Sequence, residues 1–161
     1  MQQKFAVRLL GAARLMGIHT CLDTNGYLGS RLTDADLETI DMVLLDIKGW
    51  DPDRHRRLTG MEIGPTLEFA RRLAARRRPI WIRFVLVPGL TDDLEDLAKT
   101  AEFAAGLGNV ERVEVLPFHQ MGRFKWERLG LDYTLRDVEP PTAEAAQLAC
   151  EVFRRAGLKA S

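Results

Sequence analysis

Apolar residues along this chain follow two patterns that alternate, one typical of amphipathic helices and the other of buried strands. Helical spacing predicts helices at 2–16, 34–40 and 53–58. It also predicts three further helices, a longer one that begins at Pro65 and two that follow Thr91 and Thr142 as N-caps. Phe5 and Leu9 belong to the apolar face of the first helix. Short apolar runs predict strands at 18–22, 42–45, 80–87 and 110–116.

The alternation of strands and helices indicates βα units, and therefore an α/β fold with a parallel sheet. The runs at 42–45 and 80–87 are almost continuously apolar, as expected for strands with both faces covered. Four such units form either a small open sheet or half of a barrel. The length of 161 residues fits a single domain over 1–161.

Composition and charge narrow the class of protein. The 23 basic and 23 acidic residues cancel, which argues against a generally basic nucleic-acid binder. No apolar stretch is long enough to span a membrane, and the N-terminus lacks a signal-peptide core. Cys21 and Cys150 lie far apart in the sequence, so we expect a cytoplasmic protein without disulfides. The arginine-rich run at 71–78 is expected to be a solvated helix face, with Glu68 pairing with Arg72.

Polar side chains gather where the predicted strands end. Asp23 and Thr24 follow the first strand, Asp46 and Lys48 the second, and His119 the fourth. In parallel α/β folds the ligand site lies at this edge of the sheet. Arg83 stands inside the third strand among apolar neighbours, and we expect it to point into a polar interior, because an unpaired buried guanidinium is costly. This set of groups predicts a polar ligand, together with a cation held by oxygen atoms.

Each of these residues also has a purely structural interpretation. Asp23 is able to form an Asx-turn with the residues that follow it, and Asp46 with Lys48 a plain ion pair. A lone histidine such as His119 is most often a half-buried residue with its hydrogen bonds satisfied. The functional interpretation rests on their common position at one end of the sheet.

Four segments of the chain resemble a known family in order and spacing. They are Gly17-Ile18-His19-Thr20-Cys21-Leu22-Asp23-Thr24-Asn25-Gly26, Leu44-Leu45-Asp46-Ile47-Lys48, the run from Trp81-Ile82-Arg83 to Val87-Pro88-Gly89, and the run from Gly108-Asn109 to Phe118-His119, followed by Lys125-Trp126. Together they are similar to strands three to six of the pyruvate formate-lyase activating enzymes, which are radical S-adenosylmethionine proteins. The resemblance implies a partial parallel (βα)6 barrel.

The resemblance also implies a chemistry and a partner. In this family a [4Fe–4S] cluster reduces S-adenosylmethionine, and the resulting 5′-deoxyadenosyl radical removes a hydrogen atom from a glycine of a partner glycyl radical enzyme. Matched motif by motif, the residues implied to contact the cofactor or line its cavity are Asp46, Ile47, Lys48, Arg83 and His119. Those implied to bind a monovalent cation are Asp23, Thr24 and Asp46.

The sequence departs from the family at the cluster. The family's C-x3-C-x2-C motif and its Gly-Gly-Glu segment are both missing, and two distant cysteines do not replace three thiolates. We therefore expect a C-terminal portion of an activating enzyme, without the N-terminal cluster-binding part and inactive alone. One alternative is a non-catalytic module that binds S-adenosylmethionine or docks on the lyase. Another is an unrelated enzyme with Lys48 as a Schiff-base amine, which the nearby Asp46 would disfavour.

Overall fold

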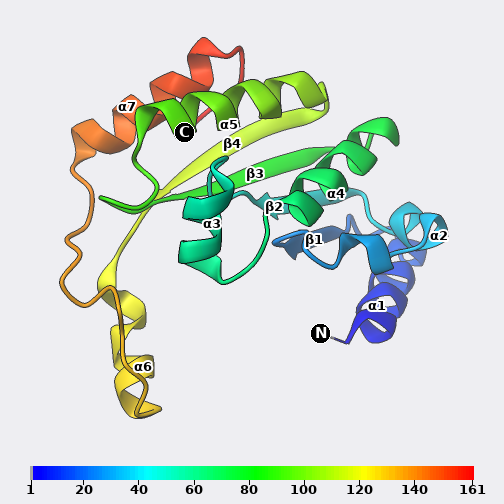
Figure 1. Cartoon of the computed structure of the whole chain (residues 1–161). Coiled ribbons are helices and arrows are strands. Elements are labelled where there is room, and N and C mark those ends of the chain that lie inside the picture. The colour runs from blue at the N-terminus through cyan, green and yellow to red at the C-terminus, as the bar shows by residue number, and fades with distance from the viewer. Residues whose placement is uncertain (1) are drawn as a thin grey trace.

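The computed structural model describes residues 2–161, which form a four-stranded parallel sheet flanked by helices (Figure 1). The sheet order is β1-β2-β3-β4, with every neighbouring pair parallel. The strands are β1 (Cys21–Thr24), β2 (Met42–Asp46), β3 (Ile80–Leu86) and β4 (Val110–Pro117). This arrangement confirms the predicted α/β class and the parallel sheet.

The helices occupy most of the segments between the strands. They are α1 (Gln3–Leu15), η1 (Gly29–Arg31), α2 (Asp34–Glu38), α3 (Pro52–Thr59), α4 (Gly64–Ala75), α5 (Leu94–Leu107), η2 (Gln120–Gly122), α6 (Arg123–Arg128) and α7 (Ala143–Arg155). None of these described helices has the length and apolar character needed to cross a membrane.

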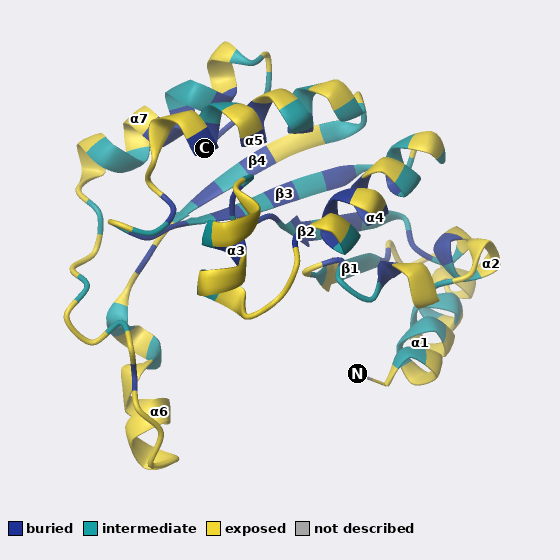
Figure 2. Ribbon diagram, viewed as in Figure 1, coloured by how far each residue is buried: buried dark blue, intermediate teal, exposed yellow. Residues whose placement is uncertain are grey.

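The two faces of the sheet differ in what covers them. Burial alternates along β3, where Ile80, Ile82 and Phe84 are completely buried and the residues between them are half-buried (Figure 2). Residues of α4, α5 and α7 pack against this buried face, and the rings of Phe84 and Phe153 meet edge-on at 5.6 Å. Each such buried side chain contributes about 1.5–3 kcal/mol. This core therefore holds the helices on one side of the strands.

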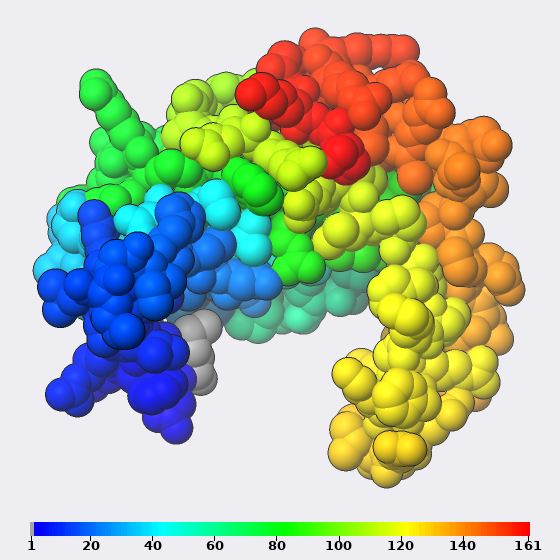
Figure 3. All heavy atoms as spheres, turned by 180° about the vertical axis from the view of Figure 1, so that it is seen from behind, coloured from blue at the N-terminus to red at the C-terminus, as the bar shows by residue number. Residues whose placement is uncertain are grey.

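The opposite side of the sheet carries the polar groups, and we call it the open face. Strand alternation and register assign to it Cys21, Asp23, Met42, Leu44, Asp46, Trp81, Arg83, Val85, Arg112, Glu114 and Leu116. Seen from behind, the molecule is hollowed between the α1 end and the segment around α6 (Figure 3). The open face is thus the side on which a ligand would have room.

Residues 118–141, which we call the arm, run out from the end of β4 and back to α7 (Figure 1). The base of the arm is anchored by Tyr133, which clusters with Phe118 and with Val87 beyond β3. The rings of Trp126 and Tyr133 lie 5.7 Å apart. The arm is therefore attached to the ends of β3 and β4 by a small apolar cluster of its own.

Two local predictions about helices are wrong. The N-cap of α5 is Asp93, which accepts a hydrogen bond from the Asp96 N–H, whereas Thr91 is buried and bonds the main chain of Val85 and Val87. In α1, Phe5 and Leu9 are 65% and 57% exposed. The helix packs instead through the side that carries Val7 and Leu10. It has apolar residues on more than one side, and periodicity alone does not choose between them.

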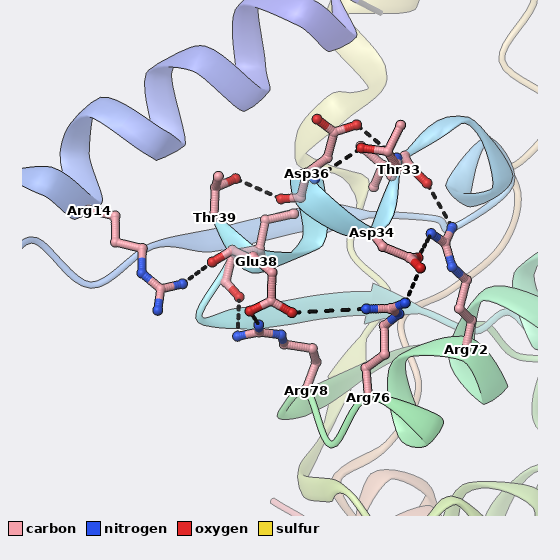
Figure 4. A network of polar contacts seen from close by, with 11 residues as sticks. Arg14, Thr33, Asp34, Asp36, Glu38, Thr39, Arg72, Arg76 and Arg78 are labelled. Carbon is pink, nitrogen blue, oxygen red and sulfur yellow. Dashed lines mark hydrogen bonds and ion pairs between the residues drawn. The ribbon is translucent and has the colours of Figure 1, made fainter.

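Part of the arginine-rich run forms ion pairs with α2 (Figure 4), while Arg71 and Arg77 are exposed as expected. Arg72 and Arg76 both pair with Asp34, and Arg78 pairs with Glu38. Arg72 also donates to the Leu32 carbonyl oxygen at 2.8 Å. The predicted partner Glu68 is therefore wrong: Arg72 serves a contact between α4 and the segment around α2.

Candidate functional site

The segment that follows β2 places charged side chains on the open face. Asp46 and Lys48 are half-buried, and the Lys48 Nζ lies 3.5 Å from the Asp46 Oδ2. Ile47 between them is 1% exposed and belongs to the core, while its N–H extends the ladder to the Arg83 carbonyl oxygen at 3.2 Å. Only the main chain of Ile47 is thus available to a ligand on the open face.

Arg83 lies beside Asp46 in the sheet register and reaches across β2 to β1. Its Nη1 donates to the Asp23 Oδ2 at 2.8 Å, and the two side chains are 31% and 56% exposed. The expectation that Arg83 points into a polar space is confirmed. The Asx-turn suggested for Asp23 is wrong, because Asn25 provides that turn through its Oδ1, which accepts from the Tyr27 N–H at 3.1 Å.

Thr24 points to the other side of the sheet. It alternates with Asp23 along β1, and its side chain lines a cavity of about 70 Å³ together with Val7, Leu10 and Phe69. Its Oγ1 accepts from the Gly26 N–H at 3.1 Å. The structure therefore brings Asp23 and Asp46 to the open face but turns the Thr24 hydroxyl away from them.

His119 stands at the far edge of the sheet from β1. It follows β4 directly and is exposed, while its neighbour Phe118 is buried at the base of the arm. The structural alternative of a half-buried histidine is therefore wrong. The order β1-β2-β3-β4 places Asp23 and His119 on opposite sides of Asp46 and Arg83, so a ligand contacting all of them would have to span the sheet.

Sequence reasoning missed the carboxylate that holds the loop after Lys48. Asp96 of α5 is only 4% exposed, and it accepts hydrogen bonds from the Trp50 and Asp51 N–H groups. Gly49 approaches it closely with φ +130°. Asp96 resembled an ordinary acidic residue in the first turn of a helix, and the sequence gives no sign that it reaches a loop more than 40 residues earlier.

A second buried polar group near this loop is His55 of α3. It is 6% exposed, and its Nδ1 is buried without a hydrogen-bond partner. Burial lowers the pKa of His55, and the positive charge of Lys48 lowers the same pKa further. His55 is therefore a neutral imidazole at pH 7, packed behind the charged edge of the site.

The cysteines do not form a cluster site. Cys21 lies half-buried on β1 and Cys150 is buried on α7, and burial raises the pKa of both thiols. Within residues 2–161, no three His, Cys, Asp or Glu side chains converge to hold a metal ion. A [4Fe–4S] cluster needs three or four thiolates in one place, so the residues present do not fit it.

The open-face groups suit a zwitterionic ligand. Asp23 and Asp46 supply two carboxylates, and Lys48 and Arg83 supply an ammonium and a guanidinium, so the formal charges of these four groups cancel. Guanidinium and ammonium groups bind carboxylates, and carboxylates bind ammonium groups or hard cations. A set of this kind suits both the carboxylate and the ammonium group of an amino acid.

Comparison with known proteins identifies the family. The model of the radical SAM superfamily matches residues 1–104, and the chain therefore belongs to this superfamily. Over 155 residues it is 44% identical to the pyruvate formate-lyase-activating enzymes of Staphylococcus epidermidis and Staphylococcus aureus, covering 92% of this chain. The chain spans 62% of the length of these relatives.

A solved structure supports the same fold. The crystal structure of a domain of pyruvate-formate lyase-activating enzyme from Bacteroides vulgatus aligns with 99% of this chain and 89% of that one. The TM-score is 0.77 at 22% sequence identity. The predicted partial barrel of the radical S-adenosylmethionine type is thereby confirmed. Membership of the superfamily implies S-adenosylmethionine and a [4Fe–4S] cluster, and the described residues include no group that would hold the cluster.

Proposed function

We propose that this chain provides the S-adenosylmethionine-binding part of an activating enzyme for a glycyl radical enzyme of the pyruvate formate-lyase type. The observation that carries the proposal is the group of charged side chains on the open face, with Lys48 at 3.5 Å from Asp46 and Arg83 at 2.8 Å from Asp23. The names of its curated relatives support the partner class. The free thiols of Cys21 and Cys150 suit a reducing cytoplasm.

Each polar group has a task in this proposal. Lys48 and Arg83 bind the methionine carboxylate of the cofactor, and Asp46 holds its ammonium group. His119 contacts the adenosine portion from the edge of β4, and Ile47 contributes its main chain. Each of these pairings matches an ionic or hydrogen-bonding group of the cofactor with a side chain or main-chain atom of suitable chemistry.

We also propose a monovalent cation beside the methionine carboxylate. The carboxylates of Asp23 and Asp46 are the oxygen ligands that the open face offers to such an ion. Thr24 takes part only through its main chain, because its hydroxyl bonds the Gly26 N–H on the other side of β1.

The proposal gives this chain binding and no cleavage step. S-adenosylmethionine supplies a 5′-deoxyadenosyl radical when a reduced cluster cleaves it, but Cys21 and Cys150 lie on separate elements and do not hold a cluster. The same observation favours a second candidate function, a module that docks on the lyase without radical chemistry.

Titration calorimetry with S-adenosylmethionine tests the proposal. We expect binding by the unmodified chain and at least a tenfold loss for Asp46→Ala, because that variant removes the acceptor for the ammonium group. Asp53→Ala, an exposed acid on α3, is the matched control and retains the affinity. A chain that folds, gives no heat with the cofactor and still co-elutes with a pyruvate formate-lyase would support the docking module and reject the binding function.

A further inference from the structure

The loop that carries Lys48 away from the sheet is fastened to a different βα unit. Asp96 lies in the first turn of α5, the helix after β3, whereas the loop at 49–51 follows β2. The Asp96 Oδ1 accepts the Asp51 N–H at 2.6 Å, and both carboxylate oxygens accept the Trp50 N–H at 3.0–3.1 Å. One side chain thus binds two consecutive main-chain groups of a distant loop.

Gly49 makes this approach possible. A Cβ at position 49 would lie 2.6 Å from the Asp96 Oδ2, closer than real contacts allow, and the φ of +130° disfavours any side chain there. Lys48 is the residue immediately before this glycine. The backbone that leaves Lys48 is therefore shaped around the Asp96 carboxylate.

The loop is held on both sides of the Asp96 contact. Before it, the Ile47 N–H bonds the Arg83 carbonyl oxygen, which ends the ladder between β2 and β3. After it, Asp51 caps α3 by accepting the Arg54 N–H at 2.6 Å. Lys48 and Gly49 lie between these fixed points, so the direction of Lys48 depends on where the Asp96 carboxylate places the next two amides.

The carboxylate of Asp96 is buried, unlike most aspartates in the first turn of a helix, which are exposed to solvent. It is 4% exposed, and burying a charge is costly unless hydrogen bonds satisfy it. Its place in the first turn of α5, behind the N-cap Asp93, adds the favourable potential of the helix N-terminus. An apolar residue at this position would fill the space but leave the Trp50 and Asp51 amides without acceptors.

We propose that Asp96 is a positioning residue, which fixes the 49–51 loop and thereby aims the Lys48 ammonium at the open face. The proposal rests on the proposed function where it names S-adenosylmethionine as the ligand that Lys48 contacts. The Asp96 side chain bonds the loop amides and faces no open-face group in these hydrogen bonds, so it acts on the ligand through Lys48.

Three variants of the full chain test this role. Asp96→Ala removes both acceptor oxygens, Asp96→Asn keeps one of them, and Glu95→Gln makes the same acid-to-amide change one residue earlier, at an exposed side chain paired with Lys99. Amide hydrogen exchange reports on the loop without any ligand. We expect the Trp50 and Asp51 amides to exchange at least tenfold faster in Asp96→Ala, with a smaller change in Asp96→Asn and none in Glu95→Gln.

Calorimetry with S-adenosylmethionine then separates positioning from general stability. The affinity is expected to fall at least tenfold in Asp96→Ala at a temperature where the variant is fully folded, and to recover in part in Asp96→Asn. A uniform acceleration of exchange over the whole chain, or an unchanged affinity beside a loosened loop, would show that Asp96 is a purely structural residue. If the unmodified chain binds no cofactor, the proposed function fails, while exchange at Trp50 and Asp51 still decides whether Asp96 fixes the loop.

A double-mutant cycle with Gly49→Ala addresses the close contact itself. In the unmodified background Gly49→Ala introduces both backbone strain and a collision with the Asp96 Oδ2, whereas in the Asp96→Ala background only the strain remains. The stability lost on Gly49→Ala should therefore be smaller in the second background. Equal losses in the two backgrounds would overturn the coupling between Gly49 and Asp96.

Discussion

Arg83 on β3 and Asp23 on β1 form an ion pair that crosses β2, with the Arg83 Nη1 at 2.8 Å from the Asp23 Oδ2. The two residues are not in the same row of the sheet, since Arg83 pairs in register with Asp46 and Asp23 pairs with Leu44. The long arginine side chain therefore leans back along the open face. Its positive charge thus lies beside Asp23, while Lys48 is the partner of Asp46.

Removing the Arg83 charge should affect binding far more than folding. Arg83→Met is expected to weaken S-adenosylmethionine binding about tenfold or more, since the methionine carboxylate loses a charged donor. The cost in stability should stay within about 1 kcal/mol, because the ion pair with Asp23 is partly exposed. Calorimetry gives the first quantity and urea unfolding the second.

Arg71→Met is the matched control for this prediction. Arg71 is an exposed arginine of α4 that lies outside the open face, so this variant should bind S-adenosylmethionine as the unmodified chain does. If Arg83→Met bound the cofactor as tightly as the unmodified chain, Arg83 would have no place in the binding site.

The buried His55 should make the stability of the fold depend on pH just below neutrality. Its folded-state pKa is lowered by burial and by Lys48, so the unfolded chain binds more protons at this residue than the folded chain. Stability is therefore full above the unfolded value of about 6.5 and is lost as the pH falls from there toward the folded pKa. We expect a smaller loss in His55→Gln, measured by denaturant unfolding between about pH 7.5 and 5.5.

The window excludes the carboxylates whose pKa values are also shifted. Hydrogen bonds from arginine side chains lower the pKa of Asp34 and Glu38, so their contributions are lost only at more acidic pH. His19→Gln, the same substitution at an exposed histidine, is the matched control. The same pH dependence in His55→Gln as in the unmodified chain would contradict the assignment.

The ion pairs between α2 and α4 should stabilise the fold in a salt-dependent manner. Asp34 pairs with both Arg72 and Arg76, so Asp34→Ala removes the carboxylate that these two guanidinium groups share. Arg72 then keeps the Leu32 carbonyl oxygen and Arg76 keeps Glu38 as a partner. We expect a lower Tm for this variant, with a difference that shrinks as the salt concentration rises toward about 1 M. Asp53→Ala removes a single exposed pair with Arg56 and should change the Tm less. A Tm difference for Asp34→Ala that did not respond to salt would show that these pairs act by packing alone.

The edge of the sheet that carries the candidate site could be predicted, because it follows from the alternation of apolar and polar residues along each strand. Alternating burial fixes the faces of β2 and β3, and parallel strands bring their carboxyl ends to one edge. Asp46, Lys48 and Arg83 follow from these rules without any knowledge of distant contacts. The same applies to the α/β class, since strands and helices alternate along the chain.

Contacts between elements that are distant in the sequence could not be predicted from the spacing of apolar and polar residues. Asp96 bonds a loop 45 residues earlier, and Arg72 bonds Asp34 from 38 residues away. In the sequence, Glu68 one turn before Arg72 was the obvious partner, but tertiary packing brings α2 closer to the guanidinium. Local spacing identifies which residues share a face of one element. It does not tell which distant element packs against that face.

Thr24 shows how a single step along a strand separates two residues that are neighbours in sequence. Its hydroxyl bonds the Gly26 N–H on the helix side of β1, whereas Asp23 faces the open side. Thr24→Val keeps the shape of the side chain and replaces this hydroxyl by a methyl group. We expect the variant to lose about 1 kcal/mol of stability with its hydrogen bond and to bind S-adenosylmethionine as the unmodified chain does.

Asp46→Asn is the contrasting variant, because it removes a charge from the open face itself. It should lower the affinity for S-adenosylmethionine and abolish any dependence of that affinity on sodium or potassium. Titrations of both variants in the presence and absence of these ions decide the matter. A Thr24→Val chain that lost its cation dependence would place the hydroxyl among the ion's ligands, and β1 would then have to turn on binding so that Thr24 reaches the open face.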